Sequence, residues 1–273
     1  MFSSFMINTW IVATLVAIVA GVVGFFVVMR GSAFAAHALP VGSLPGAAAA
    51  TLLGINPIFG LIVFSGVGVI GISQLSRHGR SDVATALCLV TLLGLGMLFL
   101  SMTTEYSQSV YALLFGEVLG VSTGQIALVA VMSIISIGAI ALMFRPLLIS
   151  SLSPELAEAR GVSSRRMELW FLSVLAFATS MALPVVGALL VFSLIVGPAS
   201  GARALTDRPL IALYLTIGIA LATVWAAISL SYVSNWPVGF FVGAGGAISY
   251  TTGHVWSRIA WPTNADTANG QPV

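Results

Sequence analysis

The sequence predicts an all-α polytopic membrane protein with about nine transmembrane or partly transmembrane helices, broken helices among them, and one short surface helix. Two observations predict this fold class. Of the 273 residues, 59% are hydrophobic and only 7% are charged, whereas soluble domains carry roughly 25% charged residues. The apolar residues also gather in tracts close to the roughly 20 residues that a helix needs to cross a bilayer. A soluble fold could not bury so much apolar surface.

The apolar tracts predict membrane spans along most of the chain. A long apolar run at the N-terminus, with no charged segment before it, indicates an anchor helix rather than a cleaved signal peptide. In chain order, the predicted spans are residues 8–29, a shorter piece that ends at residue 55, and residues 58–75, 82–102, 125–144, 169–183, 186–198, 209–232 and 239–256.

Proline and glycine predict where this pattern is interrupted. Residues 31–46 are expected to be too broken for one helix, because two prolines and two glycines fall within residues 40–46. Asn56 and Pro57 are predicted to form a turn between two spans. Pro184 is expected to open a turn or a kink after the sixth span.

The arginines predict the orientation, since cytoplasmic loops of membrane proteins carry an excess of positive charge. With nine crossings, all ten arginines fall on one side, which is then the cytoplasmic side. The N-terminus is expected outside and the C-terminus in the cytoplasm. Residues 1–261 are expected to form one transmembrane domain, and residues 262–273 a disordered cytoplasmic tail. The ten are Arg30, Arg77, Arg80, Arg145, Arg160, Arg165, Arg166, Arg203, Arg208 and Arg258.

The composition also excludes several kinds of site. The chain contains no lysine, so it cannot form the phosphate-binding loop of a P-loop ATPase, whose motif requires one. Its single cysteine, Cys88, excludes an internal disulfide and a cysteine-cluster metal site. The positive charges are scattered rather than interleaved with aromatic residues, so nucleic acid is not a predicted partner.

One long charged segment, residues 145–168, separates the apolar tracts and holds four of the ten arginines and three of the eight acidic residues. Ser153, Pro154 and Glu155 are typical of a helix start, with a capping hydroxyl, a proline in the first turn and a carboxylate near the positive helix end. Gly161 predicts the end of that helix. At about seven residues, or ~10 Å, the helix cannot cross a bilayer, and we expect it to lie along the membrane surface.

Three segments resemble one known family. They are F-A-A-H-A-L-P-V-G-S-L-P-G (residues 34–46), L-F-G followed by L-G-V-S (residues 114–122), and S-P-E-L-A-E-A-R-G (residues 153–161). With the order of the spans, they make residues 8–261 similar to the membrane permease subunits of bacterial ABC importers for zinc, manganese and iron. In that family the third segment is a D-P-E-x-A-x-x-x-G coupling segment, and Ser153 stands where the family has aspartate. Both residues are good helix caps.

The resemblance implies a transport subunit rather than an enzyme. It implies a homodimer in the bacterial cell membrane, a separate cytoplasmic ATP-binding subunit on each copy, and an extracytoplasmic protein that delivers the metal ion. Glu155 and Glu158 are expected to meet basic groups on the ATPase, while Leu156 and Ala157 pack into a groove. The alternative is an ordinary polar loop. The implied ATPase-coupling residues are Ser153, Pro154, Glu155, Leu156, Ala157, Glu158 and Gly161.

Two ionisable residues are candidates for the ion pathway. The family places an aspartate and a histidine four residues apart on one helix face; aligned on residues 44–46, those positions are His37 and Val41. His37 is therefore the candidate metal ligand, with a structural histidine as the alternative, and Val41 leaves open which metal or metal chelate is carried. Glu117, in the short apolar piece 111–122, is the second candidate, because a carboxylate at membrane depth costs about 2.5–3.5 kcal/mol. An interfacial, solvated Glu117 is its alternative.

Two other functions remain open on the sequence. A secondary transporter or channel would need no ATPase. An intramembrane serine protease would use Ser200, in the G-P-A-S-G segment of residues 197–201, with His254 as its base.

Overall fold

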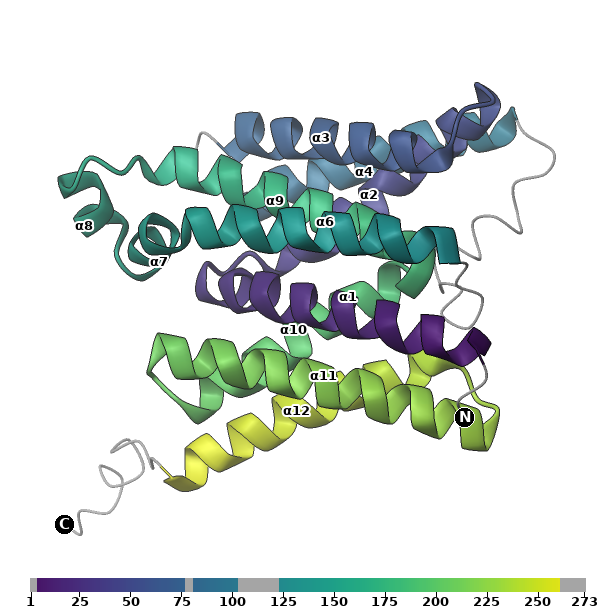
Figure 1. Cartoon of the computed structure of the whole chain (residues 1–273). Coiled ribbons are helices and arrows are strands. Elements are labelled where there is room, and N and C mark those ends of the chain that lie inside the picture. The colour runs from purple at the N-terminus through teal and green to yellow at the C-terminus, as the bar shows by residue number, and fades with distance from the viewer. Residues whose placement is uncertain (1–3, 77–80, 103–122, 261–273) are drawn as a thin grey trace, which may run out of the picture.

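The computed structural model describes residues 4–76, 81–102 and 123–260 (Figure 1). These residues form eleven helices and no strand, which confirms the all-α fold class. The helices are α1 (Ser4–Met29), α2 (Ala33–Leu52), α3 (Pro57–Leu75), α4 (Ser81–Ser101), α6 (Thr123–Leu142), α7 (Phe144–Leu152), α8 (Pro154–Ala159), α9 (Ser164–Val186), α10 (Ala188–Leu205), α11 (Pro209–Ser234) and α12 (Val238–Ala260).

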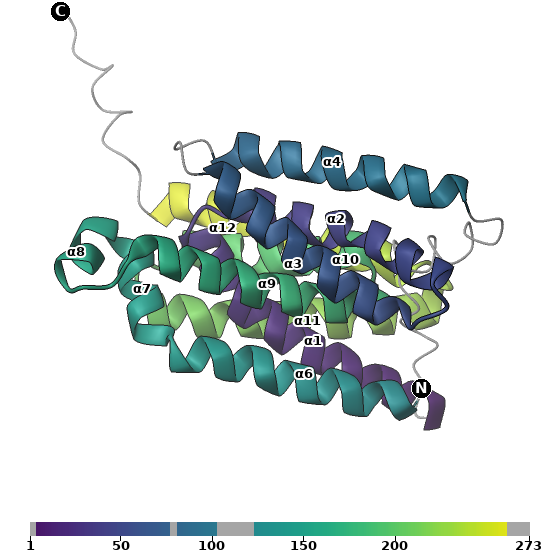
Figure 2. The ribbon, with the colours of Figure 1, turned by 90° about the horizontal axis from the view of Figure 1, so that it is seen from above.

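Several of these helices have the length and composition of membrane spans. Four of them, α1, α3, α4 and α11, are long and apolar enough to cross a membrane on their own. A fifth span is possible if α6 and α7, which meet at an angle of 63°, are taken together. The long helices run side by side in both views (Figures 1 and 2). The chain is thus polytopic, while the count of nine crossings stays a prediction.

The expectation that residues 31–46 are too broken for one helix is wrong. Helix α2 runs continuously from Ala33 to Leu52 with Pro40 and Pro45 inside it. An internal proline removes a backbone hydrogen bond and costs about 3 kcal/mol or more, but such prolines are tolerated where neighbouring helices enclose the segment. Most of α2 is enclosed in this way, since small residues on it are buried against α3, α4 and α9. Tertiary packing therefore overrides the local signal.

The other predicted interruptions have different outcomes. The Asn56–Pro57 turn is confirmed: Asn56 caps α3, its side chain accepts a hydrogen bond from the Ile58 amide at 2.9 Å, and Pro57 is the first helical residue. Of the turn or kink expected at Pro184, the turn is wrong, because α9 continues past this residue to Val186. The break comes at Gly187, whose φ of +83° is a conformation that glycine adopts at no steric cost.

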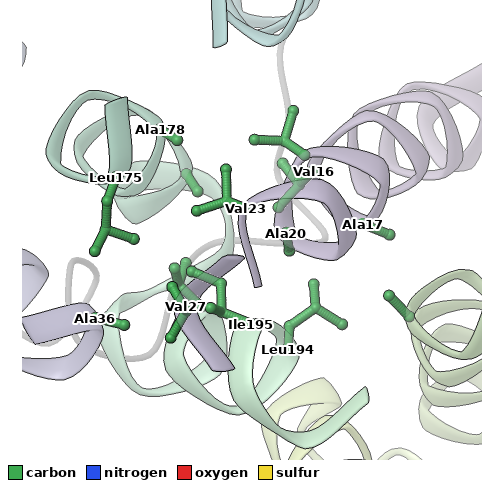
Figure 3. Close-up of a cluster of buried hydrophobic side chains, with 14 of the residues drawn as sticks. Val16, Ala17, Ala20, Val23, Val27, Ala36, Leu175, Ala178, Leu194 and Ile195 are labelled. Atoms are coloured by element: carbon green, nitrogen blue, oxygen red, sulfur yellow. The ribbon is translucent and has the colours of Figure 1, made fainter. Parts of the chain in front are cut away.

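The core lies along α1, between α9 and α10. Figure 3 shows Val16, Ala20 and Val23 of α1 facing side chains from those two helices. All three are at most 5% exposed, and Phe26, near the end of α1, is fully buried beside Phe171 of α9. Close packing of small and branched side chains is the main attraction between helices in a bilayer. Helix α1 is therefore the central element of the fold.

Two glycines set the closest contact between α2 and α3. A Cβ atom added at Gly60 would overlap the carbonyl group of Gly46, and the reverse is also true. We expect Gly60→Ala to destabilise the folded protein by about 1–3 kcal/mol, the range for overpacking. This would appear as a lower melting temperature in detergent. Gly66→Ala is the matched control on the same helix, because nothing lies within 4 Å of its added Cβ. Equal melting temperatures for the two variants would contradict this account of the contact.

Helices α7 and α8 lie at one end of the molecule, on the left of Figures 1 and 2. The C-terminal ends of α1, α10 and α12 and the N-terminal ends of α9 and α11 lie at the same end. The described arginines belong to these segments, so the structure gathers positive charge at this end. They are Arg30, Arg145, Arg160, Arg165, Arg166, Arg203, Arg208 and Arg258.

Candidate functional site

Helix α8 has the start and the end predicted for it. The Ser153 hydroxyl accepts a hydrogen bond from the Leu156 amide at 3.2 Å, and Pro154 is the first helical residue. At the other end, Gly161 has φ of +76° and donates to the Glu158 carbonyl at 2.9 Å, while Val162 donates to the Ala157 carbonyl at 2.9 Å. This pair of bonds is the Schellman arrangement, which satisfies the last carbonyl groups of a helix. Local chemistry therefore sets both ends of this six-residue helix.

The side chains of α8 divide into an inner and an outer set. Ala157 is fully buried within the chain, whereas Glu155, Glu158 and Leu156 are exposed, with Leu156 49% exposed. Ala157 therefore anchors the helix and does not present a surface to a groove on another protein. The exposed surface of α8 therefore carries the apolar side chain of Leu156, with the carboxylates of Glu155 before it and Glu158 after it in sequence.

Helix α7, which precedes α8, contacts α1 through the Phe144 ring, which lies edge-to-face on Phe26 with ring centres 5.6 Å apart, and through Arg30. The Nη1 atom of Arg30 donates to the hydroxyl oxygens of Ser150 at 2.9 Å and Ser151 at 3.3 Å. The Arg30 guanidinium lies 5.6 Å from the centre of the Phe171 ring on α9, which is cation–π distance. Burial lowers the pKa of the Arg30 guanidinium and the nearby Glu168 carboxylate raises it. The group stays charged, because an arginine is not deprotonated in proteins.

A polar cavity of about 680 Å³ lies behind α8. It separates α8 and the start of α9 from the facing ends of α3 and α4, and hydroxyl groups make up much of its lining. Its charged lining residues are Arg30, Asp82, Glu158, Arg165 and Glu168. With this lining the cavity is suited to hold water.

His37 lies on α2 and is half-buried against α10. Its ring is 4.9 Å from the ring of Phe192, in an edge-to-face arrangement. Its Nδ1 atom is buried and has no hydrogen-bond partner within the described residues. A buried polar atom without a hydrogen-bond partner costs free energy. Val41, one turn further along, packs against an apolar cluster that includes Leu44 and Leu183.

The metal-ligating capacity of this site is small. Among residues 4–76, 81–102 and 123–260, no group of three or more histidine, cysteine, aspartate or glutamate side chains could hold a metal ion. Val41 stands where the resembled family has its second ligand, so of that pair of positions only His37 carries a possible metal donor. An ion held here would keep most of its other ligands or take them from another chain. The other pathway candidate, Glu117, and the L-F-G segment around it lie outside the described residues.

The residues proposed for a serine protease do not form its geometry. Ser200 lies inside α10, which is continuous from Ala188 to Leu205, rather than on the sharp turn that presents a nucleophile. The Nδ1 atom of His254 lies 3.0 Å from the Tyr250 carbonyl oxygen, and the His254 and Tyr250 rings are tilted against each other with their centres 4.1 Å apart. The structure therefore gives no support to the protease alternative.

Sequence reasoning missed two features at the arginine-bearing end. It expected residues 125–144 to meet the charged segment directly, and so missed α7. It also treated Arg30 only as a marker of topology. The partners of Arg30 lie about 120 positions away in the chain, and no local pattern predicts a contact at that separation.

Comparison with known proteins decides the family. The sequence model of the ABC 3 transport family matches residues 2–250. The chain belongs to the ABC 3 transport family. Among curated relatives of this family member, the manganese transport system membrane protein MntC of Listeria monocytogenes is 30% identical over 240 residues, covering 85% of this chain and 83% of that protein. The high-affinity zinc uptake system membrane protein ZnuB of Buchnera aphidicola is 25% identical over 231 residues, covering 84% and 88%.

A solved structure shares the fold of this family member. PsaBC from Streptococcus pneumoniae, in complex with Fab, matches with a TM-score of 0.83 and 23% identity, over 94% of this chain and 96% of that one. Together with the family match, this confirms the resemblance that residues 34–46, 114–122 and 153–161 predict.

Proposed function

We propose that this ABC 3 family member is the permease subunit of an ATP-driven importer that moves a divalent metal ion, zinc, manganese or iron, across the bacterial cell membrane. The observation that carries the proposal is α8: a capped surface helix at the arginine-bearing end, with Glu155, Leu156 and Glu158 exposed. A family match over residues 2–250 and relatives that are manganese and zinc transport proteins support it.

The energy for import comes from a separate chain. With no lysine in the sequence, this subunit cannot supply the phosphate-binding loop of an ATPase. We propose that a cytoplasmic ATP-binding subunit docks on α8 and that an extracytoplasmic binding protein delivers the ion at the opposite face. Two copies of the permease form a homodimer, each with its own ATPase.

The topology we propose has nine crossings, made by α1, α2, α3, α4, α6, α9, α10, α11 and α12. Consecutive members of this set run in opposite directions in Figure 1. The end that carries α7, α8 and the described arginines then faces the cytoplasm. On this topology the N-terminus is outside, the C-terminus is inside, residues 1–261 are one transmembrane domain, and residues 262–273 are a cytoplasmic tail.

The ion is proposed to pass His37 and to be bound there weakly. One imidazole suits zinc, manganese or iron, and a sparse site favours release, which transport requires. The unpartnered Nδ1 atom of His37 supports this role. Because Val41 supplies no second donor, a metal chelate is the other substrate class that fits the site.

The proposed function is tested by the metal content of cells. A strain lacking the chain is expected to hold several-fold less manganese or zinc in metal-poor medium, and the wild-type gene is expected to restore the content. A catalytically dead ATPase subunit should produce the same deficit. Normal metal content in the deletion strain under metal limitation would contradict the proposal.

A further inference from the structure

We propose that Arg30 is a positioning residue that transmits movement of α8 to the transmembrane bundle. The inference rests on the proposed function, because it takes α8 to be the point where an ATPase acts. Helices α7 and α8 are here called the coupling unit (residues 144–159). The angle of 63° between α6 and α7 sets this unit off from the long helices, and Arg30 bridges back to it from the end of α1.

At this contact each serine hydroxyl donates its proton within α7 and accepts a hydrogen bond from Arg30. The hydroxyl groups of Ser150 and Ser151 donate to the Leu147 carbonyl, at 3.0 Å and 2.6 Å. Their oxygen lone pairs are then free to accept from Arg30 Nη1, at 2.9 Å and 3.3 Å. The ring of Phe171 supports the guanidinium from the side of α9. Three elements, α1, α7 and α9, therefore meet at one charged group.

The coupling unit has other attachments as well: Phe144 lies edge-to-face on Phe26 of α1, Leu148 packs against the core, and the Ser164 hydroxyl donates to the Pro154 carbonyl at 3.5 Å. Leu147 and Ala157 are its fully buried apolar side chains, and the polar cavity of about 680 Å³ lies between α8 and the ends of α3 and α4. Hydrogen bonds to a charged group are among the stronger directional contacts in proteins. The contact at Arg30 is thus the charged joint between the coupling unit and the end of α1.

On the side of the bundle, the contact at Arg30 leads to α1, which lies at the centre of the fold. Arg30 directly follows α1, which packs against α6, α9, α10 and α11 and contributes Val16, Ala20 and Val23 to the core in Figure 3. A displacement of Arg30 therefore acts on a helix that is packed against four others in this core. Small shifts in a packed core switch it between discrete arrangements and do not deform it smoothly.

The test uses the permease with its ATPase subunit in proteoliposomes, with ATP hydrolysis and metal uptake measured in the same sample. We expect Arg30→Met and the double variant Ser150→Ala/Ser151→Ala to retain ATP hydrolysis and ATPase binding. Uptake per ATP should fall about tenfold in both. Arg30→Lys should restore part of it. Arg208→Met removes an exposed arginine at the same end, away from the coupling unit, and should behave like wild type.

The energetic coupling between Arg30 and the two serines gives a second readout, again measured as uptake per ATP. If Arg30 acts through the serines, the triple variant should lose no more uptake per ATP than Arg30→Met alone. The inference is overturned if Arg30→Met and the double serine variant both keep wild-type uptake per ATP. If Arg30→Met does not assemble, the double serine variant decides alone, since it keeps the arginine. Wild-type protein that takes up no metal with ATP would instead overturn the proposed function itself.

Discussion

Reversing both carboxylates of α8 is expected to detach the permease from its ATPase. Glu155→Arg/Glu158→Arg places two positive charges beside Leu156, where the proposed docking surface presents two negative ones. Like charges across an interface cost several kcal/mol, and we expect the affinity for the ATPase to fall at least about a hundredfold. The measurement is the dissociation constant of the detergent-solubilised permease and the purified ATPase, at low ionic strength where surface charges are least screened.

Asp207→Arg is the control for this charge reversal. Asp207 is exposed in the connection between α10 and α11, so this variant changes the charge at the same end without altering α8. It should bind the ATPase as wild type does. If the double glutamate variant also binds with wild-type affinity, α8 is not the docking helix.

Removing the imidazole of His37 is expected to weaken ion capture. In our proposal His37 is the pathway ligand. Its Nδ1 atom has no hydrogen-bond partner within the described residues, and its side chain on α2 is half-buried. We expect His37→Ala to raise the KM for manganese or zinc uptake about tenfold, since loss of a group that supports metal binding commonly costs 10–100-fold in affinity. The uptake rate at saturating ion should change little. The measurement is the ion dependence of ATP-driven uptake.

His254→Ala serves as the matched control, because His254 is exposed on α12 and its ring lies against the ring of Tyr250. Its KM should equal that of wild type. An unaltered KM in His37→Ala would mean that His37 is a structural residue, and the ion pathway would have to be sought elsewhere in the chain.

The features that the sequence predicted well depend on local chemistry. Ser153 and Gly161 delimit α8 because a hydroxyl caps a helix start and glycine tolerates positive φ, whatever surrounds them. Asn56 and Pro57 delimit the start of α3 for the same kind of reason. The length and apolarity of α1, α3, α4 and α11 also follow from the sequence alone, since a bilayer fixes how long an apolar helix must be.

The features that the sequence predicted poorly depend on contacts between distant segments. Pro40 and Pro45 lie inside α2 because α3, α4 and α9 enclose that helix, and none of this packing is visible in residues 31–46. Helix α9 also continues past Pro184, and the break comes at Gly187. His37 was found through a family motif rather than through any pattern in the chain itself. Arg30 was missed as a joint because Ser150 and Ser151 become its neighbours only in the folded protein.

The central claim, that this chain is a membrane permease energised through α8 by a separate ATPase, is tested most directly in proteoliposomes. Uptake of manganese and zinc would be measured with the permease alone, with the permease and ATPase without ATP, and with both subunits and ATP. The account predicts uptake against a gradient only in the last case, and its loss with Glu155→Arg/Glu158→Arg. Uptake by the permease alone, driven by an ion or proton gradient, would contradict it and identify a secondary transporter.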